Sequence, residues 1–344
     1  MPERTLTQAE LNRAVLARQM LLERSKVSIP RALERMCGLQ AQYARSMYIG
    51  LWSRVEGLER AAVTRSLERR ATVQATIMRG TIHLVSRGDY WPFEEAVRRA
   101  RRSWYLRASP NAASERRMVA AANKLRRHLA GGSMRRAEIE ELLGKDEARG
   151  VGMFLSLVRV PPAGTWARRR ADVFGLAEDW LGPSESDEER GTALLVERYL
   201  RAFGPATRAD IRDFTGLAFA QVDPALERLT LRRFRTEDGR PLLDLPRMPL
   251  PPGDTPAPVR FLPTWDALLL VHARRTGVLP EEHRAKVFNT KMPQSVGTFL
   301  VDGAVAGTWR HDKGGVAIEP FERLSNSVRG EVEAEAARLA GFCA

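Results

Sequence analysis

The feature that most constrains the fold is an internal repeat of eight residues. Segment 132–139, Gly-Ser-Met-Arg-Arg-Ala-Glu-Ile, matches segment 204–211, Gly-Pro-Ala-Thr-Arg-Ala-Asp-Ile, at the Gly, the Arg-Ala pair, the acidic residue and the Ile. Each copy follows a segment with helical periodicity and opens another helix. A third helix and a β-hairpin follow each time, around Pro161-Pro162-Ala163-Gly164 and Asp238-Gly239. Three helices and a hairpin are the order of a winged helix, a helix-turn-helix variant that packs on DNA.

The expected elements can be placed by residue number. The first copy predicts helices at 116–129, 135–143 and within 151–157, with a hairpin at 158–173. The second copy predicts helices at 194–203, 208–215 and 221–229, with a hairpin at 231–245. The N-terminal part repeats the pattern less cleanly, with helices at 8–24, 30–37, 47–56 and 58–69, a strand at 75–85 and a basic helix at 90–106.

These patterns predict an α+β protein that is mostly helical, with three tandem winged-helix units and a small C-terminal β-rich subdomain. We expect the units at 1–108, 109–186 and 187–246, and the β-rich subdomain with its terminal helix at 247–344. This last part begins at a Pro-rich linker, 246–258, contains the hairpin turn Asp302-Gly303 and ends with a helix at 328–340.

The charge of the chain points to a polyanionic partner. The formal net charge is +13 and the predicted pI is about 10.5. Most of the basic residues are arginine, which suits forked contacts to phosphates and base edges. A GC-rich genome explains the preference for arginine over lysine, but it does not explain the net excess of positive charge. Because basic residues gain affinity by displacing counterions from phosphates, nucleic acid is the first candidate partner.

Several classes of site and location are disfavoured by the sequence. We expect a cytoplasmic protein, because no apolar run approaches the length of a membrane span and the N-terminus lacks the apolar centre of a signal peptide. DNA binding would associate it with the nucleoid, and three DNA-binding units in one chain would let it act as a monomer. The two cysteines, Cys37 and Cys343, are too few for a disulfide framework and are expected to be reduced. The histidines lack metal-ligand spacing and no glycine-rich phosphate loop is present, so we predict no metal and no nucleotide cofactor.

The segment Gln40-Ala41-Gln42 carries two amides separated by one small apolar residue. On an α-helix, residues i and i+2 point to different faces, whereas in an extended backbone they project to the same side. The preceding helix, 30–37, has Pro30 in its first turn and Gly38 as a C-terminal stop. We therefore expect residues 39–42 to be extended and to line a cleft. The alternative is that Gln40 and Gln42 are ordinary turn amides that cap helix ends.

Four segments together resemble the AlkZ/YcaQ family of bacterial DNA glycosylases. They are Leu39-Gln40-Ala41-Gln42 with the aromatic-rich stretch 43–52, Arg79-Gly80-Thr81-Ile82-His83, Phe261–Asp266 and Asp302–Trp309. The resemblance covers essentially the whole chain. The signature of the AlkZ branch is Gln-aliphatic-Gln and that of the YcaQ branch is Gln-aliphatic-Asp, so this sequence is similar to the AlkZ branch.

The resemblance implies a C-shaped arrangement of winged helices around duplex DNA and the excision of N7-alkylguanine. In the AlkZ branch it also implies the unhooking of interstrand crosslinks made by antibiotic alkylators, and thus a role in self-resistance. Gln40 and Gln42 would be the catalytic residues of a monofunctional enzyme without cofactors. Its partner would be double-stranded DNA that contains alkylated guanine.

The candidate DNA contacts are drawn from the motif, the hairpins and the C-terminal strands. They are Arg45, Arg79, Thr81, His83, Arg168, Arg169, Arg232, Arg233, Trp309 and Arg310. For each arginine the alternative is a solvated charged surface, for His83 a partly buried structural role, and for Trp309 a place in the core.

Two other functions remain open at the level of the sequence. A non-catalytic winged-helix transcriptional regulator is the main alternative, because most helix-turn-helix folds are binding modules. Regulators usually read palindromic half-sites as dimers, however, whereas three units in one chain can surround DNA as a monomer. A nuclease is disfavoured because no carboxylate cluster suited to two metals stands out.

Overall fold

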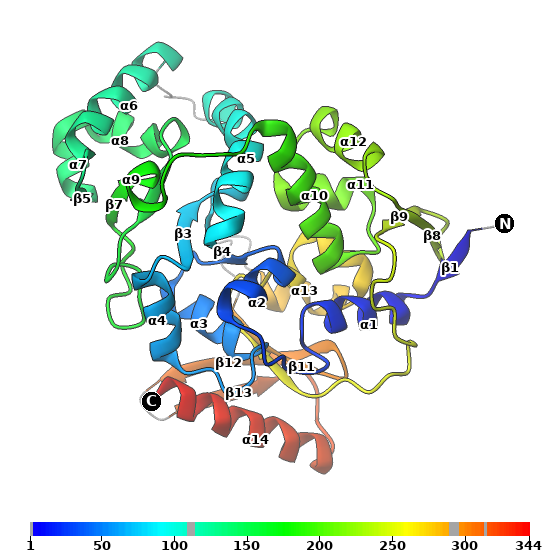
Figure 1. Ribbon diagram of the computed structural model, residues 1–344. Coiled ribbons are helices and arrows are strands. Elements are labelled where there is room, and N and C mark those ends of the chain that lie inside the picture. The colour runs from blue at the N-terminus through cyan, green and yellow to red at the C-terminus, as the bar shows by residue number, and fades with distance from the viewer. Residues whose placement is uncertain (1–2, 109–113, 289–295, 313–314) are drawn as a thin grey trace.

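The computed structural model describes residues 3–108, 114–288, 296–312 and 315–344 and shows an α+β fold (Figure 1). The described strands form sheets of three, four and six strands. The helices surround these sheets, and the long helix α5 (Arg87–Ala108) and helix α10 (Glu188–Phe203) pack against each other. The predicted α+β class is therefore confirmed.

The N-terminal region contains α1 (Gln8–Arg18), α2 (Ile29–Met36), α3 (Ala44–Trp52) and α4 (Arg60–Glu68). Helix α1 begins at a capping box in which Thr7 and Glu10 satisfy each other's backbone N–H groups. The helix predicted for 8–24 is shorter in the structure, because the chain turns at Met20, whose φ is 58°.

The single strand predicted for 75–85 is instead an antiparallel hairpin. Its strands are β3 (Thr72–Thr76) and β4 (Ile82–Ser86), and a 3-10 turn, η1 (Met78–Gly80), joins them. Arg79 and Gly80 both have positive φ, at 54° and 69°, and these two left-handed residues reverse the chain. Neither Asn-Gly nor Asp-Gly marks this turn, so the turn signal is weak in the sequence.

The hairpin forms the middle of the six-stranded sheet, whose order is β2-β4-β3-β6-β7-β5. Strand β2 (Leu39–Gln40) lies at one edge. The other strands are β5 (Ser133–Arg135), β6 (Leu157–Arg159) and β7 (Val173–Leu176). Ala75 of β3 pairs with Val158 of β6, so the sheet crosses the unit boundary expected at residue 108. The first two expected units thus share one sheet, while the domain division itself stays a prediction.

The two sequence repeats fold into similar orders of elements. The first contains α6 (Glu115–Leu129), α7 (Arg136–Leu143), α8 (Lys145–Gly150) and η2 (Val151–Met153), followed by the pair β6–β7 and α9 (Ala177–Leu181). The second contains α10, α11 (Arg208–Thr215), α12 (Phe219–Glu227) and the hairpin β8 (Arg232–Thr236) to β9 (Pro241–Asp244). A short strand that the sequence did not predict, β1 (Arg4–Leu6), pairs in parallel with β8.

The C-terminal region is β-rich, as predicted. Strands β10 (Arg260–Leu262), β11 (Gly297–Val301), β12 (Ala304–Asp312) and β13 (Gly315–Pro320) form the four-stranded antiparallel sheet. Helix α14 (Asn326–Cys343) packs against this sheet (Figure 1). Between β10 and β11 lie η3 (Ala267–Leu269), η4 (Val271–Thr276), η5 (Glu281–His283) and α13 (Arg284–Val287).

The turn Asp302-Gly303 joins β11 to β12, as predicted, and packs against α1, with Gly303 buried and the Asp302 side chain largely exposed. Asn12 Nδ2 donates a hydrogen bond of 2.9 Å to the Gly303 carbonyl, and Arg13 Nη2 lies 2.6 Å from Asp302 Oδ1. A Cβ at position 303 would come within 2.5 Å of Arg13, so only glycine fits against α1 here. Through these contacts, the turn holds α1 against the four-stranded sheet.

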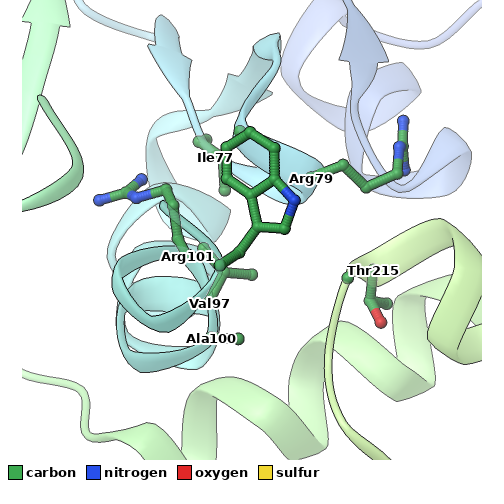
Figure 2. A pocket seen from close by; sticks show the side chains of 9 residues that line it. Ile77, Arg79, Val97, Ala100, Arg101 and Thr215 are labelled. Atoms are coloured by element: carbon green, nitrogen blue, oxygen red, sulfur yellow. The ribbon is translucent and has the colours of Figure 1, made fainter. Parts of the chain in front are cut away.

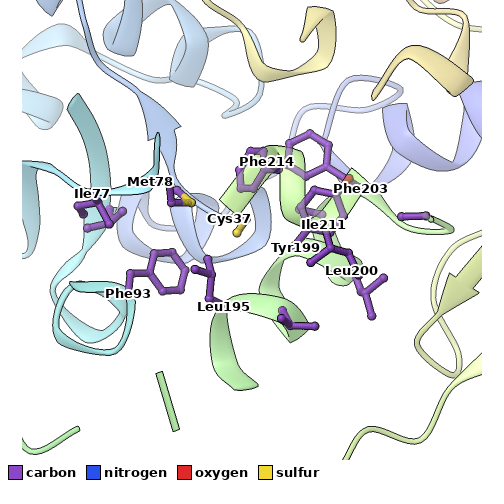
Figure 3. Close-up of a cluster of buried hydrophobic side chains, with 14 of the residues drawn as sticks. Cys37, Ile77, Met78, Phe93, Leu195, Tyr199, Leu200, Phe203, Ile211 and Phe214 are labelled. Carbon is purple, nitrogen blue, oxygen red and sulfur yellow. The ribbon is translucent and has the colours of Figure 1, made fainter. Parts of the chain in front are cut away.

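The largest hydrophobic core connects α1, η1, α5, α10 and α11 (Figure 3). Tyr199, Phe203 and Phe214 form a group of rings with centroids 5.0–5.4 Å apart. Burial of each such ring contributes about 1.5–3 kcal/mol, so this core firmly supports the segment after α2. Cys37 lies in the same core, and both it and Cys343 are buried free thiols, as predicted.

Candidate active site

The segment that carries the two amides leaves α2 through two left-handed residues. Cys37 has φ of 60° and Gly38 has φ of 78°. A Cβ on Gly38 would lie 3.0 Å from Val85 Cγ1, so glycine allows the chain to pass close to β4. The chain then forms β2, whose Gln40 is paired with His83, and the Ala41 N–H donates to the Ile82 carbonyl at 2.7 Å. The helix has ended and strand β2 covers Leu39–Gln40, as predicted, but Gln42 lies in a bend beyond the strand, so the extended segment is shorter than the predicted 39–42.

Both glutamine side chains contact the same short segment, 79–82. Gln40 is 7% exposed, and its Oε1 accepts a hydrogen bond of 3.2 Å from Arg79 Nη2. Gln42 is exposed, and its Oε1 accepts a hydrogen bond of 3.3 Å from the backbone N–H of Ile82. A guanidinium and a backbone N–H can only donate, so the atom that faces each of them must be the amide oxygen. The orientation of both amides is therefore fixed by their neighbours.

Arg79 connects Gln40 to helix α11. Its guanidinium also donates to the Phe214 carbonyl at the end of α11, and its Cζ lies 5.0 Å from the centre of the Phe214 ring. Burial lowers the pKa of Arg79 to about 10, so the side chain is still charged at neutral pH. The sequence favoured a phosphate contact for Arg79, whereas the structure directs its guanidinium to two partners inside the protein.

Thr81 and His83 also have partners within the hairpin. The Thr81 hydroxyl donates to the Met78 carbonyl at 3.1 Å, and His83 Nδ1 lies 3.0 Å from the Thr81 carbonyl. Because a carbonyl only accepts, Nδ1 carries the proton of the neutral ring. His83 is 2% exposed, and burial, together with the charge of Arg79, lowers its pKa to about 3. His83 is thus a neutral, buried residue and not a cationic phosphate contact.

Two cavities flank the Arg79-Gly80 turn. The first, of about 230 Å³, is lined by Gln42 together with residues of α7, α8 and η2. Arg159, whose guanidinium donates to the Thr76 hydroxyl at 3.0 Å, also lines this cavity. The second, of about 210 Å³, lies between the turn, α5 and the end of α11 (Figure 2). Gly80 lines both cavities.

A cluster of positive charge lies close to the glutamine motif. Arg45, three residues after Gln42, lies over the Trp166 ring at 4.6 Å, and Arg60 lies over the same ring at 5.0 Å. Burial and the positive charge of Arg169 lower the pKa of Arg45. The structure thus brings two predicted DNA contacts, Arg45 and Arg169, together. The sequence did not identify Arg60 or Trp166, because they are far from each other along the chain.

The remaining candidate DNA contacts are dispersed. Arg168 is exposed and lies 3.8 Å from Asp172. Arg232 and Arg233 are exposed on β8, in the three-stranded sheet, and Arg310 is exposed on β12, in the four-stranded sheet. Trp309 is partly buried, and its indole N–H donates to the Leu262 carbonyl at 2.9 Å. These contacts give Trp309 a packing role, and the three sheets place the arginines on separate parts of the protein.

The described residues offer neither a cluster suited to a metal ion nor a helix that could cross a bilayer. They contain no group of three or more His, Cys, Asp or Glu side chains arranged to hold a metal ion. No helix in the described ranges is both long enough and apolar enough to cross a bilayer.

Comparison with known protein families shows that the chain is a DNA glycosylase, an enzyme that acts on DNA. More particularly, the model of the family "DNA glycosylase AlkZ-like" matches residues 33–342, so the chain belongs to the AlkZ-like DNA glycosylase family. This result favours the enzyme over the regulator and nuclease alternatives.

A solved structure supports the same fold. The chain is similar to the Streptomyces sahachiroi DNA glycosylase AlkZ, with a TM-score of 0.81 and 21% sequence identity over 98% of this chain and 97% of that one. No curated protein matches the chain by sequence.

Proposed function

We propose that the chain is a monofunctional glycosylase that hydrolyses the N-glycosidic bond of N7-alkylguanine in duplex DNA, including bulky adducts and interstrand crosslinks. Gln40 and Gln42 are the catalytic residues, and the three helical regions act as winged-helix units that form a C-shaped cleft around the DNA. The observation that carries this proposal is the pair of amides held by the 79–82 segment, one buried and one at the wall of a cavity.

The lesion supplies most of the chemical driving force. Alkylation at N7 places a positive charge on guanine, so the base leaves without protonation by an acid. What remains is to place a water near the anomeric carbon and to stabilise a sugar that resembles an oxocarbenium ion, as in glycoside hydrolysis. An enzyme without a strong base suits this reaction and spares unmodified guanine, which is a poor leaving group.

The two amides can together position the attacking water, one from an exposed position and one from a buried position. Each amide oxygen has a second lone pair that can accept a hydrogen bond from water, and each NH₂ group can donate one. Gln42 is exposed at the cavity wall, so its amide can bind the attacking water. Gln40 is buried and held by Arg79, so we assign its amide the role of orienting the same water from behind the cavity wall. No lysine occurs between Lys26 and Lys124, which agrees with a water nucleophile and an abasic product without strand cleavage.

The test is the excision of N7-methylguanine from a duplex by purified protein, without added metal or nucleotide. Gln42→Ala should lower the single-turnover rate by on the order of 10²-fold, as expected for a positioned catalytic group. Gln42→Asp should keep activity, because it places a carboxylate base at the same site. Gln42 is exposed, so neither change should affect the melting temperature.

The matched control is Gln221→Ala, which removes an amide on α12 that contacts Glu188 and the Ala96 carbonyl. This variant should excise the base at the parental rate. If the double variant Gln40→Ala/Gln42→Ala excises the base as fast as the parent, the motif is structural and the proposed mechanism is wrong.

A further inference from the structure

The second cavity beside the glutamine motif has an apolar lining and an exposed indole. Most of its surface is apolar, from Ile77, Val97, Ala100 and Trp104, the glycines Gly80 and Gly216 form part of the wall, and Arg79, Arg101 and Thr215 complete the lining. In Figure 2, Val97 and Ala100 of α5 lie on one side of this space and Thr215, at the end of α11, lies on the other. The proposed reaction at Gln40 and Gln42 makes no use of this cavity.

Trp104 is unusual for its exposure. It is 51% exposed, whereas the other tryptophans of the described ranges are buried or partly buried. A large aromatic side chain gains stability when it packs away from water, so this exposed indole does not add to the core. An indole face at the wall of an apolar cavity is suited to stack on another flat ring.

The dimensions of the cavity limit what it can hold. Its volume of about 210 Å³ is smaller than pockets that enclose a whole ligand, which occupy roughly 300–1,000 Å³. The two glycines leave their part of the wall without side chains, so a flat group can lie close to the backbone. The cavity therefore fits one planar substituent and not a complete nucleotide.

Gly80 places this cavity next to the one that contains Gln42. A Cβ at position 80 would lie 3.6 Å from the Trp104 ring and 3.6 Å from Met153 Cε. Trp104 lines the apolar cavity and Met153 lines the Gln42 cavity, so Gly80 is the low boundary between the two. A group attached to a base beside Gln42 can cross this boundary only because residue 80 has no side chain.

We propose that the apolar cavity is a specificity subsite for a planar aromatic substituent carried by the alkylated guanine, with Trp104 as its stacking surface. This inference rests on the proposed excision of N7-alkylguanine and names the class of lesion that this chain favours. The lesion's guanine lies beside Gln42, and its N7 substituent crosses Gly80 and stacks on Trp104.

The experiment compares three lesions at the same position of one duplex: N7-methylguanine, a guanine with a naphthylmethyl group at N7, and a guanine with the saturated decahydronaphthylmethyl group. Trp104→Ala should lower the ratio of naphthylmethyl to methyl excision by roughly tenfold, the usual effect of losing one aromatic stacking surface. The saturated substituent has similar bulk but no aromatic face, so its ratio should change much less. Ala100→Phe fills the cavity from α5 and should also lower the naphthylmethyl ratio.

The control variant is Val119→Ala, which removes an exposed apolar side chain on α6, outside both cavities. It should leave all three rates unchanged. Affinity for the naphthylmethyl duplex, measured in the Gln40→Ala/Gln42→Ala background, should fall in parallel with the excision ratio when Trp104 is replaced.

The outcomes separate this inference from the proposed function. If the parent excises none of the three lesions, the proposed function is wrong. If it excises them but Trp104→Ala leaves the ratios unchanged, or lowers all three rates equally, the subsite is wrong while the glycosylase mechanism stands.

Discussion

Replacing Arg79 by alanine tests whether the amide of Gln40 must be held in one orientation. The change removes the guanidinium that lies 3.2 Å from Gln40 Oε1, so the amide can rotate away from the water site. A hydrogen bond to a charged group contributes about 1.5–3 kcal/mol. Since 1.36 kcal/mol corresponds to a factor of ten in rate, excision should slow by about tenfold to a hundredfold.

The stability of the variant can be worked out from the same contacts. The loss of two hydrogen bonds, to Gln40 and to the Phe214 carbonyl, costs roughly 3–6 kcal/mol. Against this, burial lowers the pKa of Arg79 from 12.5 to about 10, which corresponds to at most roughly 3 kcal/mol of charge burial that the variant no longer requires. The net loss is up to about 3 kcal/mol, so a domain of ordinary stability stays folded.

The assay is single-turnover excision of N7-methylguanine by Arg79→Ala, with and without millimolar guanidinium chloride. The cavity beside Arg79 admits a small cation, so added guanidinium should restore part of the rate. Arg260→Ala is the matched control, because burial also lowers the pKa of Arg260 to about 10 and its guanidinium donates to the Val259 and Leu22 carbonyls. That variant should lose stability while keeping the parental rate.

A double variant gives the decisive result. If Arg79 acts through Gln40, then Gln40→Ala/Arg79→Ala should be no slower than Gln40→Ala alone, because the two effects are not independent. Fully additive losses, or an Arg79→Ala variant that works at the parental rate, would refute the role of Arg79 in positioning Gln40.

Two further predictions concern acid stability and DNA binding. Unfolded His83 takes up a proton below its usual pKa of 6.5, whereas in the folded protein burial lowers the pKa of His83 to about 3. Acidification from pH 7 to pH 5 should therefore lower the free energy of unfolding by roughly 2 kcal/mol. His83→Gln should flatten this pH dependence in thermal melts, and an unchanged slope would contradict a buried neutral ring. Affinity for undamaged duplex should fall steeply with salt if binding rests on many arginine–phosphate contacts, as we propose. A logarithmic slope near zero, in place of about −0.9 per contact, would contradict a DNA-binding surface built from these arginines.

The sequence predicted elements best where local signals agreed. Helix α11 begins and ends at Arg208 and Thr215, as expected, because a capping box at Thr207 and a left-handed Gly216 mark its ends. The hairpin β3–β4 was missed because its turn depends on Arg79 in a left-handed conformation, which arginine rarely adopts by local preference. The contacts of the 79–82 segment with Gln40 and Phe214 hold this turn in place.

At the candidate site, too, the sequence predicted local backbone structure but not contacts between residues that are far apart in the chain. The i, i+2 spacing of Gln40 and Gln42 predicted that the backbone would be extended there, and β2 confirms this for Leu39–Gln40, whereas Gln42 lies in the bend that follows. The partners of these amides could not be predicted, because Arg79 is 39 residues from Gln40 and 135 residues from Phe214. The positive cluster at Trp166 likewise depends on packing between α3, α4 and the segment before β7.

The proposed mechanism explains why this site uses amides beside so many arginines. Donors already engage both amide oxygens, Arg79 at Gln40 and the Ile82 N–H at Gln42, and this engagement weakens each oxygen as an acceptor for water. A weak acceptor provides little base catalysis, so hydrolysis depends on the positive charge that the lesion itself carries. In the proposed mechanism, affinity comes from phosphate contacts of the surface arginines, which do not depend on the base. Binding and discrimination thus rest on different residues, and a stronger base at the motif would gain rate at the expense of selectivity.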